Sequence, residues 1–422
     1  MATRSRAMRL AFVHNHPSGG AARAVHALGL QLARRHEIDV FTLSSSDETF
    51  VSSADYARVT HVAPFRLRPA RRFMFYVNDM QRYRDLGALE AAYGDMAREI
   101  DGGGYDAVLV SACRYLQAPS VLADLHTPAA YYCHEPPRRF LPPEWRTAGG
   151  PIGRYERMRA FWHGPADVII DRTLRERDHR NVAAADVVLT NSRFTASLIA
   201  SYYQREARVC YLGVDTARAP AAERPGEYAL SVGAIEHHKG FDFVVEAIAA
   251  LKRDIRPPLL IVGNAANPAV RDHLQRLAQE RGVRLTIRSV VSDDELAAAY
   301  AGARVFVYAP HHEPFGLAAL EAMAAGLPVV AVAEGGVTEI VVDGVTGVTA
   351  PRDASRFADA LARVLSEPDW ARELGSAARR RVEADWRWDA AAERIEDALF
   401  SIARGRSAPN GDAAEAVTAA MR

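Results

Sequence analysis

Cysteine and long apolar runs are scarce in this sequence of 422 residues. The three cysteines, Cys113, Cys133 and Cys210, show no Cys-x-x-Cys spacing and no even framework, which favours a reducing compartment over a disulfide-bonded one. No apolar run approaches the roughly 18 residues that a transmembrane helix needs. The apolar run after Arg9 has four residues, too short for the core of a signal peptide. These features predict a cytoplasmic protein.

The chain has no excess of positive or negative charge, because 52 Lys and Arg residues balance 52 Asp and Glu residues. Binding to nucleic acid is therefore not expected. Residues 65–85 depart from this balance locally, with six arginines interleaved with aromatic residues. One interpretation is weak association with the inner face of a membrane or with an anionic acceptor; the other, which the overall charge favours, is an ordinary basic loop and amphipathic helix.

Signatures of cofactors and metals are absent as well. The first predicted strand, residues 9–13, is not followed by the Gly-x-Gly-x-x-Gly fingerprint of dinucleotide-binding proteins. His14 and His16 come after that strand, but no carboxylate or cysteine is spaced to complete a metal site with them. We therefore expect no cofactor and no metal, and interpret the two histidines as side chains that line a site.

The most informative stretch lies between residues 304 and 333. Two β-branched runs, 304–308 and 329–333, predict buried strands, and the segment between them carries an apolar stripe of helical period at Leu317, Leu320 and Met323. Gly326 and Pro328 are placed to end that helix. Ligands of parallel sheets bind beyond the carboxyl ends of the strands, so the loop 309–316 is predicted to face a ligand.

Two carboxylates flank the start of this helix. Glu313 lies in the loop and Glu321 about one turn into the helix. A helix N-terminus attracts anionic or hydroxyl-rich ligands, and each carboxylate suits a pair of hydroxyls, while Gly316 would let the backbone approach the ligand. The alternative is a capping carboxylate and a solvated helix face, and the spacing alone does not decide between them.

Alternating strands and helices recur twice along the chain. Strands are predicted at 9–13, 37–43, 105–111, 129–133, 184–190 and 207–216 in the first half, and at 228–233, 258–263, 283–291, 304–308 and 329–333 in the second. This pattern predicts two doubly wound α/β domains that face a cleft. The predicted boundaries are 1–215 and 228–385 for the domains, 216–227 for a linker rich in Ala, Pro and charge, 386–403 for an amphipathic C-terminal helix, and 404–422 for a disordered tail.

The run Glu-Pro-Phe-Gly-Leu-Ala-Ala-Leu-Glu (313–321), continued by Ala-Met-Ala-Ala-Gly-Leu-Pro-Val-Val, closely resembles the Glu-x7-Glu signature of the family 4 glycosyltransferases. Further matches to this family follow in the right order from about residue 8 to residue 400. The resemblance implies a GT-B fold, with an acceptor-binding first domain, a nucleotide-sugar-binding second domain and a C-terminal helix that crosses back onto the first. It also implies retaining, metal-independent transfer of a hexose, and no Asp-x-Asp metal motif is present.

The resemblance assigns roles to individual residues. In the family, a Gly-Gly loop faces the donor diphosphate, a lysine neutralises it, the two glutamates hold sugar and ribose hydroxyls, and a backbone segment contacts the base. The corresponding donor-binding residues are Gly19, Gly20, Lys239, Val290, Glu313, Phe315, Gly316, Leu317 and Glu321. The run 131–138, Tyr-Tyr-Cys-His-Glu-Pro-Pro-Arg, resembles a family segment that brings a histidine to the acceptor. It assigns acceptor contacts to His134, Glu135 and Arg138, and the expected catalytic residues are His134, Lys239 and Glu313.

One position departs from the family pattern. Ala234 stands where an arginine usually helps the lysine to neutralise the diphosphate, and Arg193 and Arg138 are candidate substitutes. GDP-mannose or a UDP-sugar is the expected donor, and a saccharide, a lipid-linked saccharide or a small molecule the expected acceptor. A phosphorylase or nucleotide-sugar epimerase of the same fold, and a catalytically silent nucleotide-sugar-binding protein, are the alternatives.

Overall fold

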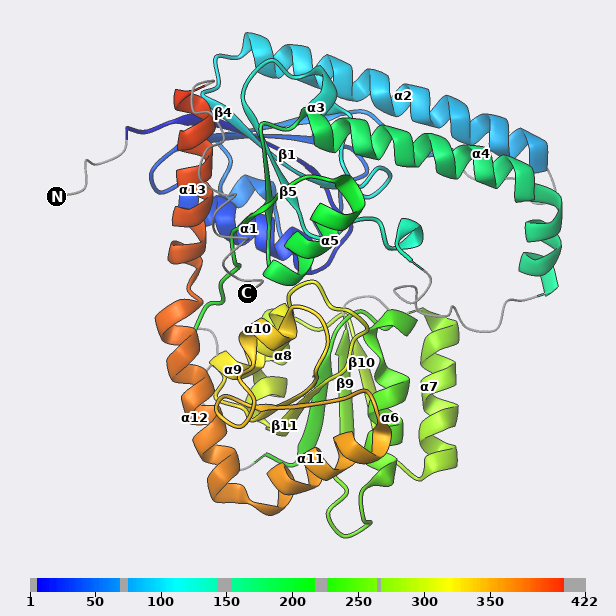
Figure 1. Cartoon of the computed structure of the whole chain (residues 1–422), viewed down its shortest axis with the longest axis vertical. Helices are drawn as coiled ribbons and strands as arrows, with labels where there is room; N and C mark the ends of the chain where they lie inside the picture. The colour runs from blue at the N-terminus through cyan, green and yellow to red at the C-terminus, as the bar shows by residue number, and fades with distance from the viewer. Residues whose placement is uncertain (1–5, 69–74, 143–153, 217–225, 264–266, 406–422) are drawn as a thin grey trace, which may run out of the picture.

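The computed structural model describes residues 6–68, 75–142, 154–216, 226–263 and 267–405, and the chain forms two parallel sheets in succession (Figure 1). The first sheet has the strand order β3-β2-β1-β4-β5-β6-β7 and the second β10-β9-β8-β11-β12-β13. In both sheets, successive strands are added first on one side of the first strand and then on the other. The direction changes between β1 and β4 in the first sheet and between β8 and β11 in the second. A crevice for ligands forms at such a reversal, beyond the carboxyl ends of the strands.

The first sheet is built from apolar, β-branched runs that are buried on both faces, as strands of a parallel sheet require. Every residue of β4 and β5 is buried. The strands are β1 (Arg9–Asn15), β2 (Glu37–Leu43), β3 (Val59–Ala63), β4 (Ala107–Cys113), β5 (Ala129–Cys133), β6 (Val187–Thr190) and β7 (Arg208–Val209). The strand predicted at 207–216 is thus much shorter, because the chain leaves the sheet after Val209 toward the second domain.

The second sheet follows the same plan with fewer strands. These are β8 (Tyr228–Val232), β9 (Leu259–Gly263), β10 (Leu285–Ser289), β11 (Ala303–Tyr308), β12 (Val329–Val332) and β13 (Val348–Ala350). Phe306, Val307 and Tyr308 of β11 pair in parallel with Val329, Val330 and Ala331 of β12. The predicted strand–loop–helix–strand unit around residues 304–333 is therefore confirmed.

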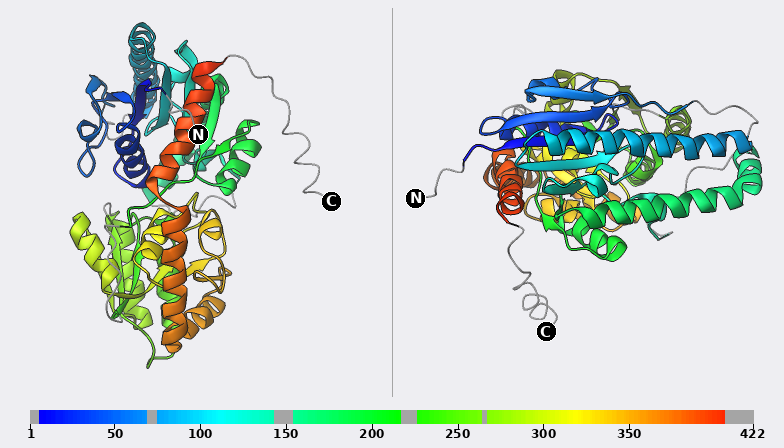
Figure 2. Two further views of the ribbon diagram at one scale, coloured as in Figure 1. Left: turned by 90° about the vertical axis from the view of Figure 1, so that its left-hand side faces the viewer. Right: turned by 90° about the horizontal axis from the view of Figure 1, so that it is seen from above.

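Helices cover both sheets and meet in the middle of the molecule (Figures 1 and 2). In the first half they are α1 (Gly20–Leu32), α2 (Phe75–Gly102), α3 (Val121–Asp124), α4 (Arg154–Ala184) and α5 (Arg193–Tyr203). In the second half they are α6 (Phe241–Ala250), α7 (Pro268–Arg281), α8 (Asp293–Ala301), α9 (Leu317–Ala324), α10 (Val337–Ile340), α11 (Ala354–Ser366), α12 (Pro368–Asp385) and α13 (Trp388–Arg404). Among the described residues, none of these helices combines the length and the hydropathy required to cross a bilayer.

The C-terminal helices join the two halves. Helix α12 runs along the second half and α13 returns to the first, where it packs against α1 (Figure 2, left). The buried carboxylate of Glu396 on α13 pairs with Arg35 at 2.8 Å and with His36 at 3.1 Å. The turn between α12 and α13 lies beside the other connection between the halves, since the amide of Val214 donates to the carbonyl of Trp386 over 2.9 Å. The predicted crossing of the C-terminal helix is confirmed, and it begins at Trp388 rather than at residue 386.

Several predicted features fall partly outside the described residues. These are 69–74 within the basic segment, 217–225 within the linker, and 406–422 within the tail. In the described part of the basic segment, Arg68 pairs with the buried Asp85 at 3.4 Å, so this arginine has a partner within the fold. The domain boundaries proposed from the sequence stay predictions.

Candidate functional site

Glu313 and Lys239 meet at the carboxyl edge of the second sheet. The Nζ of Lys239 donates to Oε2 of Glu313 over 2.8 Å, and the two side chains are 21% and 14% exposed. Burial alone would raise the pKa of Glu313, but the charge and hydrogen bond of Lys239, with Arg138 and His238 nearby, hold that pKa below its usual value. Glu313 is therefore a carboxylate at neutral pH, and Lys239 supplies a fixed positive charge beside it.

Close backbone packing fixes the loop that carries Glu313. A Cβ atom on Gly335 would lie 2.5 Å from the carbonyl oxygen of Glu313, and one on Gly336 would lie 2.2 Å from that of Pro314. Real Cβ atoms do not approach so closely, so both positions require glycine. From the other side, the guanidinium of Arg352 donates to the carbonyls of Ala309 and Pro310 over 2.9 and 2.8 Å. Glu313 is thus held on a rigid support.

Helix α9 begins immediately after this loop. Gly316 is its N-cap with φ of 110°, a conformation that side chains rarely adopt. The first backbone N–H groups of a helix have no partner within the helix, and they carry the positive end of its dipole. Binding of an anion by the amides of Phe315, Gly316 and Leu317 at this helix start stays a prediction.

Glu321 lies one turn into α9 and already has two partners. The hydroxyl of Tyr300 donates to Oε2 over 2.8 Å, and a guanidinium nitrogen of Arg23, from the first half of the chain, lies 3.8 Å from Oε1. Burial raises the pKa of Glu321, against the opposing effects of Arg23 and Tyr300. The sequence predicted neither partner, because Tyr300 precedes Glu321 by a whole strand and loop and Arg23 belongs to the other domain.

Val290 stands out in its backbone conformation. Its φ is +58°, which is strained for a β-branched residue, and its side chain is 66% exposed. It directly follows β10, and its amide donates to the carbonyl of Gly263 over 3.0 Å. Strain held in place at the carboxyl edge of a sheet points to function, and its role in contacting a base remains a prediction.

Three buried histidines converge from the carboxyl ends of β1 and β5. The ring of His16 lies 5.6 Å from that of His14 and 5.7 Å from that of His134. The hydroxyl of Ser111, on β4, bridges Nε2 of His16 and Nε2 of His134 at 2.9 and 3.1 Å. Burial lowers the pKa of His14 and of His134 to about 4, and that of His16 also falls well below its usual value, so all three are neutral at pH 7. They form a neutral, polar edge on the first sheet.

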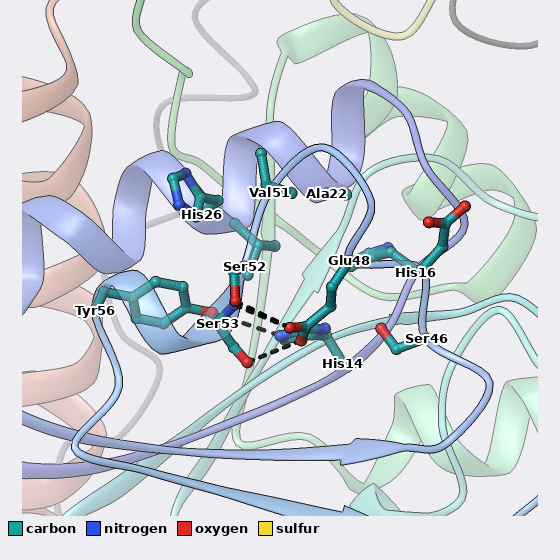
Figure 3. A pocket seen from close by; sticks show the side chains of 12 residues that line it. His14, His16, Ala22, His26, Ser46, Glu48, Val51, Ser52, Ser53 and Tyr56 are labelled. Carbon is teal, nitrogen blue, oxygen red and sulfur yellow. Dashed lines mark hydrogen bonds between the residues drawn. The ribbon is translucent and has the colours of Figure 1, made fainter. Parts of the chain in front are cut away.

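A cavity lies between this edge and α1 (Figure 3). It is small, with a cavity volume of about 20 Å³, and Glu48, Ser52, Ser53 and Tyr56 line it together with His14. Nδ1 of the buried His14 has no hydrogen-bond partner within the described residues, whereas Glu48 accepts from the hydroxyl of Ser53 over 2.8 Å. The cavity is therefore lined by an imidazole and by a carboxylate beside the β1–α1 loop.

The glycine pair of that loop is open to its surroundings. A Cβ on Gly19 or on Gly20 would meet no atom within 4 Å. Gly19 has φ of 155° and ψ of −170°, which glycine alone adopts readily, and α1 begins at Gly20. No neighbouring atom therefore crowds the Cα atoms of this pair, and phosphate binding there stays a prediction.

Three side chains of the first half bind the backbone of the Glu313 loop. The guanidinium of Arg138 donates to the carbonyls of His311 and His312 over 2.9 and 3.2 Å. It also pairs with Glu135 at 2.9 Å. Ser192 and Thr195, at the start of α5, donate to the carbonyl of Pro314 over 2.5 and 3.1 Å. The two halves are therefore closed on each other at the loop.

Glu339, on α10, makes a further contact between the halves. Both carboxylate oxygens of Glu339 accept from the first amides of α5, those of Arg193 and Phe194, over 3.0 and 2.8 Å. The hydroxyl of Tyr211 donates to the same carboxylate over 2.7 Å. A carboxylate at a helix N-terminus is stabilised by the unpaired amides and by the dipole. Glu339 thus caps a helix of the other domain.

Two family models match the chain and together span most of it. The model for Glycosyltransferase Family 4 matches residues 18–218, and the model for Glycosyl transferases group 1 matches residues 215–381. A GDP-mannose-dependent alpha-(1-6)-phosphatidylinositol monomannoside mannosyltransferase from Mycobacterium tuberculosis H37Rv is 32% identical over 343 residues, covering 73% of this chain and 86% of that protein. The chain belongs to the family 4 glycosyltransferases.

Other relatives of this glycosyltransferase match over a shorter length or by structure alone. A glycogen synthase from the same strain is 36% identical over 205 residues, or 47% of this chain, and the match spans about half (49%) of that relative. Sucrose-phosphate synthase from Thermosynechococcus elongatus superposes with a TM-score of 0.66 at 22% identity, covering 94% of this chain and 99% of that chain. Anabaena HepE in complex with UDP and glucose gives 0.71 at 17%, covering 93% and 100%. These structures confirm the predicted GT-B fold.

Ala234 stands where the family pattern has an arginine, and Arg138 and Arg193 were the candidates to supply the missing charge. The methyl group of Ala234 supplies no charge, and of the two candidate substitutes only Arg138 acts on the pKa of Glu313. Arg193 contributes its backbone amide to the cap by Glu339. Arg138 therefore has the better geometry for a second positive charge near the donor, and this role remains a prediction.

Proposed function

We propose that this glycosyltransferase moves a hexose from a nucleoside diphosphate sugar to an acceptor hydroxyl, with retention of anomeric configuration and without a metal ion. The observation that supports it most is the pair of Lys239 and Glu313, held rigidly at the start of α9. A departing diphosphate develops negative charge, and preorganised donors around it lower the barrier. Lys239 and the amides of α9 supply such donors on one side of the cleft, and the Gly19 and Gly20 amides supply them on the other.

In this proposal the two glutamates bind the donor rather than attack it. Glu313 holds hydroxyls of the transferred sugar, and Glu321 holds hydroxyls of the ribose. The strained backbone at Val290 contacts the base. GDP-mannose is the leading candidate, since one relative is a GDP-mannose-dependent mannosyltransferase, and a UDP-sugar is the second, since HepE binds UDP and glucose.

His134 faces the acceptor in this proposal, with Glu135 and Arg138 beside it. A neutral imidazole accepts or donates one hydrogen bond at each nitrogen, and Ser111 occupies Nε2. Nδ1 of His134 then remains for an acceptor hydroxyl. The leaving phosphate, on the same face, would take the proton of that hydroxyl. The acceptor is a saccharide, a lipid-linked saccharide or a small molecule.

The basic segment, residues 65–85, is a candidate for contact with a membrane. We infer weak, peripheral contact through residues 65–85, on the grounds of its arginines and of Leu67, which is 49% exposed. Sedimentation with anionic and with neutral vesicles tests this. Equal sedimentation with both, or none with either, would remove the inference.

The proposed activity is tested in two steps. Thermal unfolding with UDP, GDP, ADP and TDP and their sugars identifies the base, because a ligand of the native state raises the melting temperature by mass action. Transfer from the sugar donor so identified is then followed by nucleotide release with candidate acceptors, and the anomer of the product is read by NMR. Phosphate-dependent release of free sugar would favour a phosphorylase, donor conversion without acceptor an epimerase, and binding without turnover a silent protein.

A further inference from the structure

A single hydroxyl group joins two buried histidines, His16 and His134. Strand β4, which carries Ser111, lies between β1, which leads to His16, and β5, which leads to His134. The Oγ of Ser111 lies 2.9 Å from Nε2 of His16 and 3.1 Å from Nε2 of His134. Ser111, His16 and His134 are 1%, 3% and 8% exposed, so bulk water has little access to this contact.

The neighbours of His134 restrain both its ring and its backbone. The ring of Tyr132 lies 4.8 Å from that of His134, and the ring of His16 lies 5.7 Å away at an interplanar angle of 78°. The side-chain amide of Asn191 donates to the backbone carbonyl of His134 over 3.1 Å. With ring and backbone restrained, the property of His134 that can still vary is which ring nitrogen carries the proton.

The contact at Ser111 holds a limited number of protons. A hydroxyl has one proton to donate and two lone pairs to accept with, and a neutral imidazole carries its proton on one nitrogen. Within the described residues, the two Nε2 atoms are the partners of the Ser111 hydroxyl. If neither Nε2 carried a proton, the hydroxyl could donate to only one of them. If both did, the hydroxyl proton would have no acceptor. A buried polar group without a partner costs about 1–3 kcal/mol.

Two arrangements leave none of these groups unsatisfied. In the first, His16 donates from Nε2 to Ser111, and Ser111 donates to Nε2 of His134; in the second, both hydrogen bonds are reversed. In each arrangement one Nε2 carries a proton and the other does not, so the tautomers of the two histidines depend on each other. The first arrangement makes Nδ1 of His134 a hydrogen-bond donor, and the second makes it an acceptor.

We propose that His16 and Ser111 are positioning residues of the transfer reaction, which fix whether Nδ1 of His134 donates to or accepts from a hydroxyl of the acceptor. The inference rests on the proposed transferase function and adds two residues that act through His134 without touching the acceptor. His14 has a different place in the cluster, because its ring lies 5.6 Å from that of His16 and, within the described residues, its side chain makes no hydrogen bond with Ser111.

Nuclear magnetic resonance of protein with isotope-labelled histidine tests the coupling, because the shifts of the ring nitrogens distinguish the two tautomers. His16→Gln and His134→Gln assign the signals. At neutral pH we expect the fractions of Nε2–H in His16 and in His134 to add up to one. Ser111→Ala should change the tautomer ratio of His134 by about tenfold, the effect of one hydrogen bond. Ser111→Thr, which keeps the hydroxyl, should preserve the ratio, and so should His14→Gln, the matched change of a buried histidine.

Steady-state kinetics with the identified donor and acceptor supply a second readout. Ser111→Ala should lower kcat/KM for the acceptor by about tenfold, Ser111→Thr should restore most of it, and calorimetry should give the same nucleotide affinity for both variants and the wild type.

Three results would overturn the inference: protons on both Nε2 atoms or on neither, an equal tautomer ratio of His134 in wild type and Ser111→Ala, or an equal kcat/KM in these two proteins. The spectra need no substrate. Absence of transfer by the wild type would therefore count against the proposed function, and the coupling between the two histidines would still be decided by the spectra.

Discussion

The replacement Lys239→Met removes the positive charge that lies 2.8 Å from Glu313 and keeps most of the side-chain volume. At that distance the attraction between unit charges is about 6 kcal/mol at an effective dielectric constant of about 20, most of it offset by the cost of removing both groups from water. The variant leaves Glu313 largely buried, with the guanidinium of Arg138 as a remaining positive neighbour. We expect a loss of about 2–4 kcal/mol in the free energy of unfolding.

The loss of activity has a separate origin. Lys239 would stabilise charge that develops on the diphosphate, and removal of one such donor reduces kcat by about 100-fold or more, or about 2.7 kcal/mol. The double variant Lys239→Met/Glu313→Gln separates the two effects, because it removes the unpaired carboxylate. It should recover most of the stability and little of the activity. Lys252→Met, at an exposed position of the second domain, is the matched control.

Urea denaturation and steady-state kinetics with the identified donor supply the two readouts. A near-normal kcat in Lys239→Met would refute the proposed role of the lysine. Recovery of activity in the double variant would show that Lys239 acts only by neutralising Glu313. Unchanged stability in the single variant would contradict the energetic argument for the pair.

Four further predictions concern other parts of the molecule. Glu321→Gln should weaken nucleotide binding by about 1–3 kcal/mol if the carboxylate holds the ribose, and Tyr300→Phe should weaken it less; equal affinity of wild type and Glu321→Gln by calorimetry would remove that role. His134→Gln should reduce transfer more than donor binding, and equal losses would place it outside the acceptor site. Burial lowers the pKa of His14 and of His134 to about 4, so both side chains are neutral in the folded protein at pH 7. In the unfolded chain they take up protons near pH 6.5. The free energy of unfolding should therefore fall by about 1–3 kcal/mol for each histidine as the pH is lowered from 6.5 toward 4. A pH series of urea denaturation in which His134→Gln loses as much stability as wild type over this interval would contradict that assignment. Glu339→Gln should loosen the closure between the halves, since it removes the charge that caps α5, and small-angle scattering should then give a larger radius of gyration; an unchanged radius would show that the loop contacts suffice.

The sequence by itself determined the elements and the family. Short apolar runs separated by helical periods specify parallel strands, because burial on both faces tolerates few polar residues. The motif 313–321 placed a loop, a glycine cap and two carboxylates at the carboxyl edge of a sheet, since strand, loop and helix are local in sequence. Two strands at sheet edges, β3 (Val59–Ala63) and β13 (Val348–Ala350), were not predicted, because edge strands are half-buried and lack the continuous apolar run of a central strand. The strand after residue 207 was predicted too long, since the tertiary contacts of the connection decide where it ends.

Only the tertiary structure decided which groups meet. Lys239 reaches Glu313 across 74 residues, and Arg138 reaches the same loop across 173 and 174. Glu339 caps a helix of the other domain, and Tyr300 and Arg23 contact Glu321. No local pattern in the sequence predicts any of these contacts. Spacing along the chain carries information over a few turns of helix or strand. The charges of a cleft between two domains are assembled by the packing of distant segments, and their pKa values and partners follow from that packing.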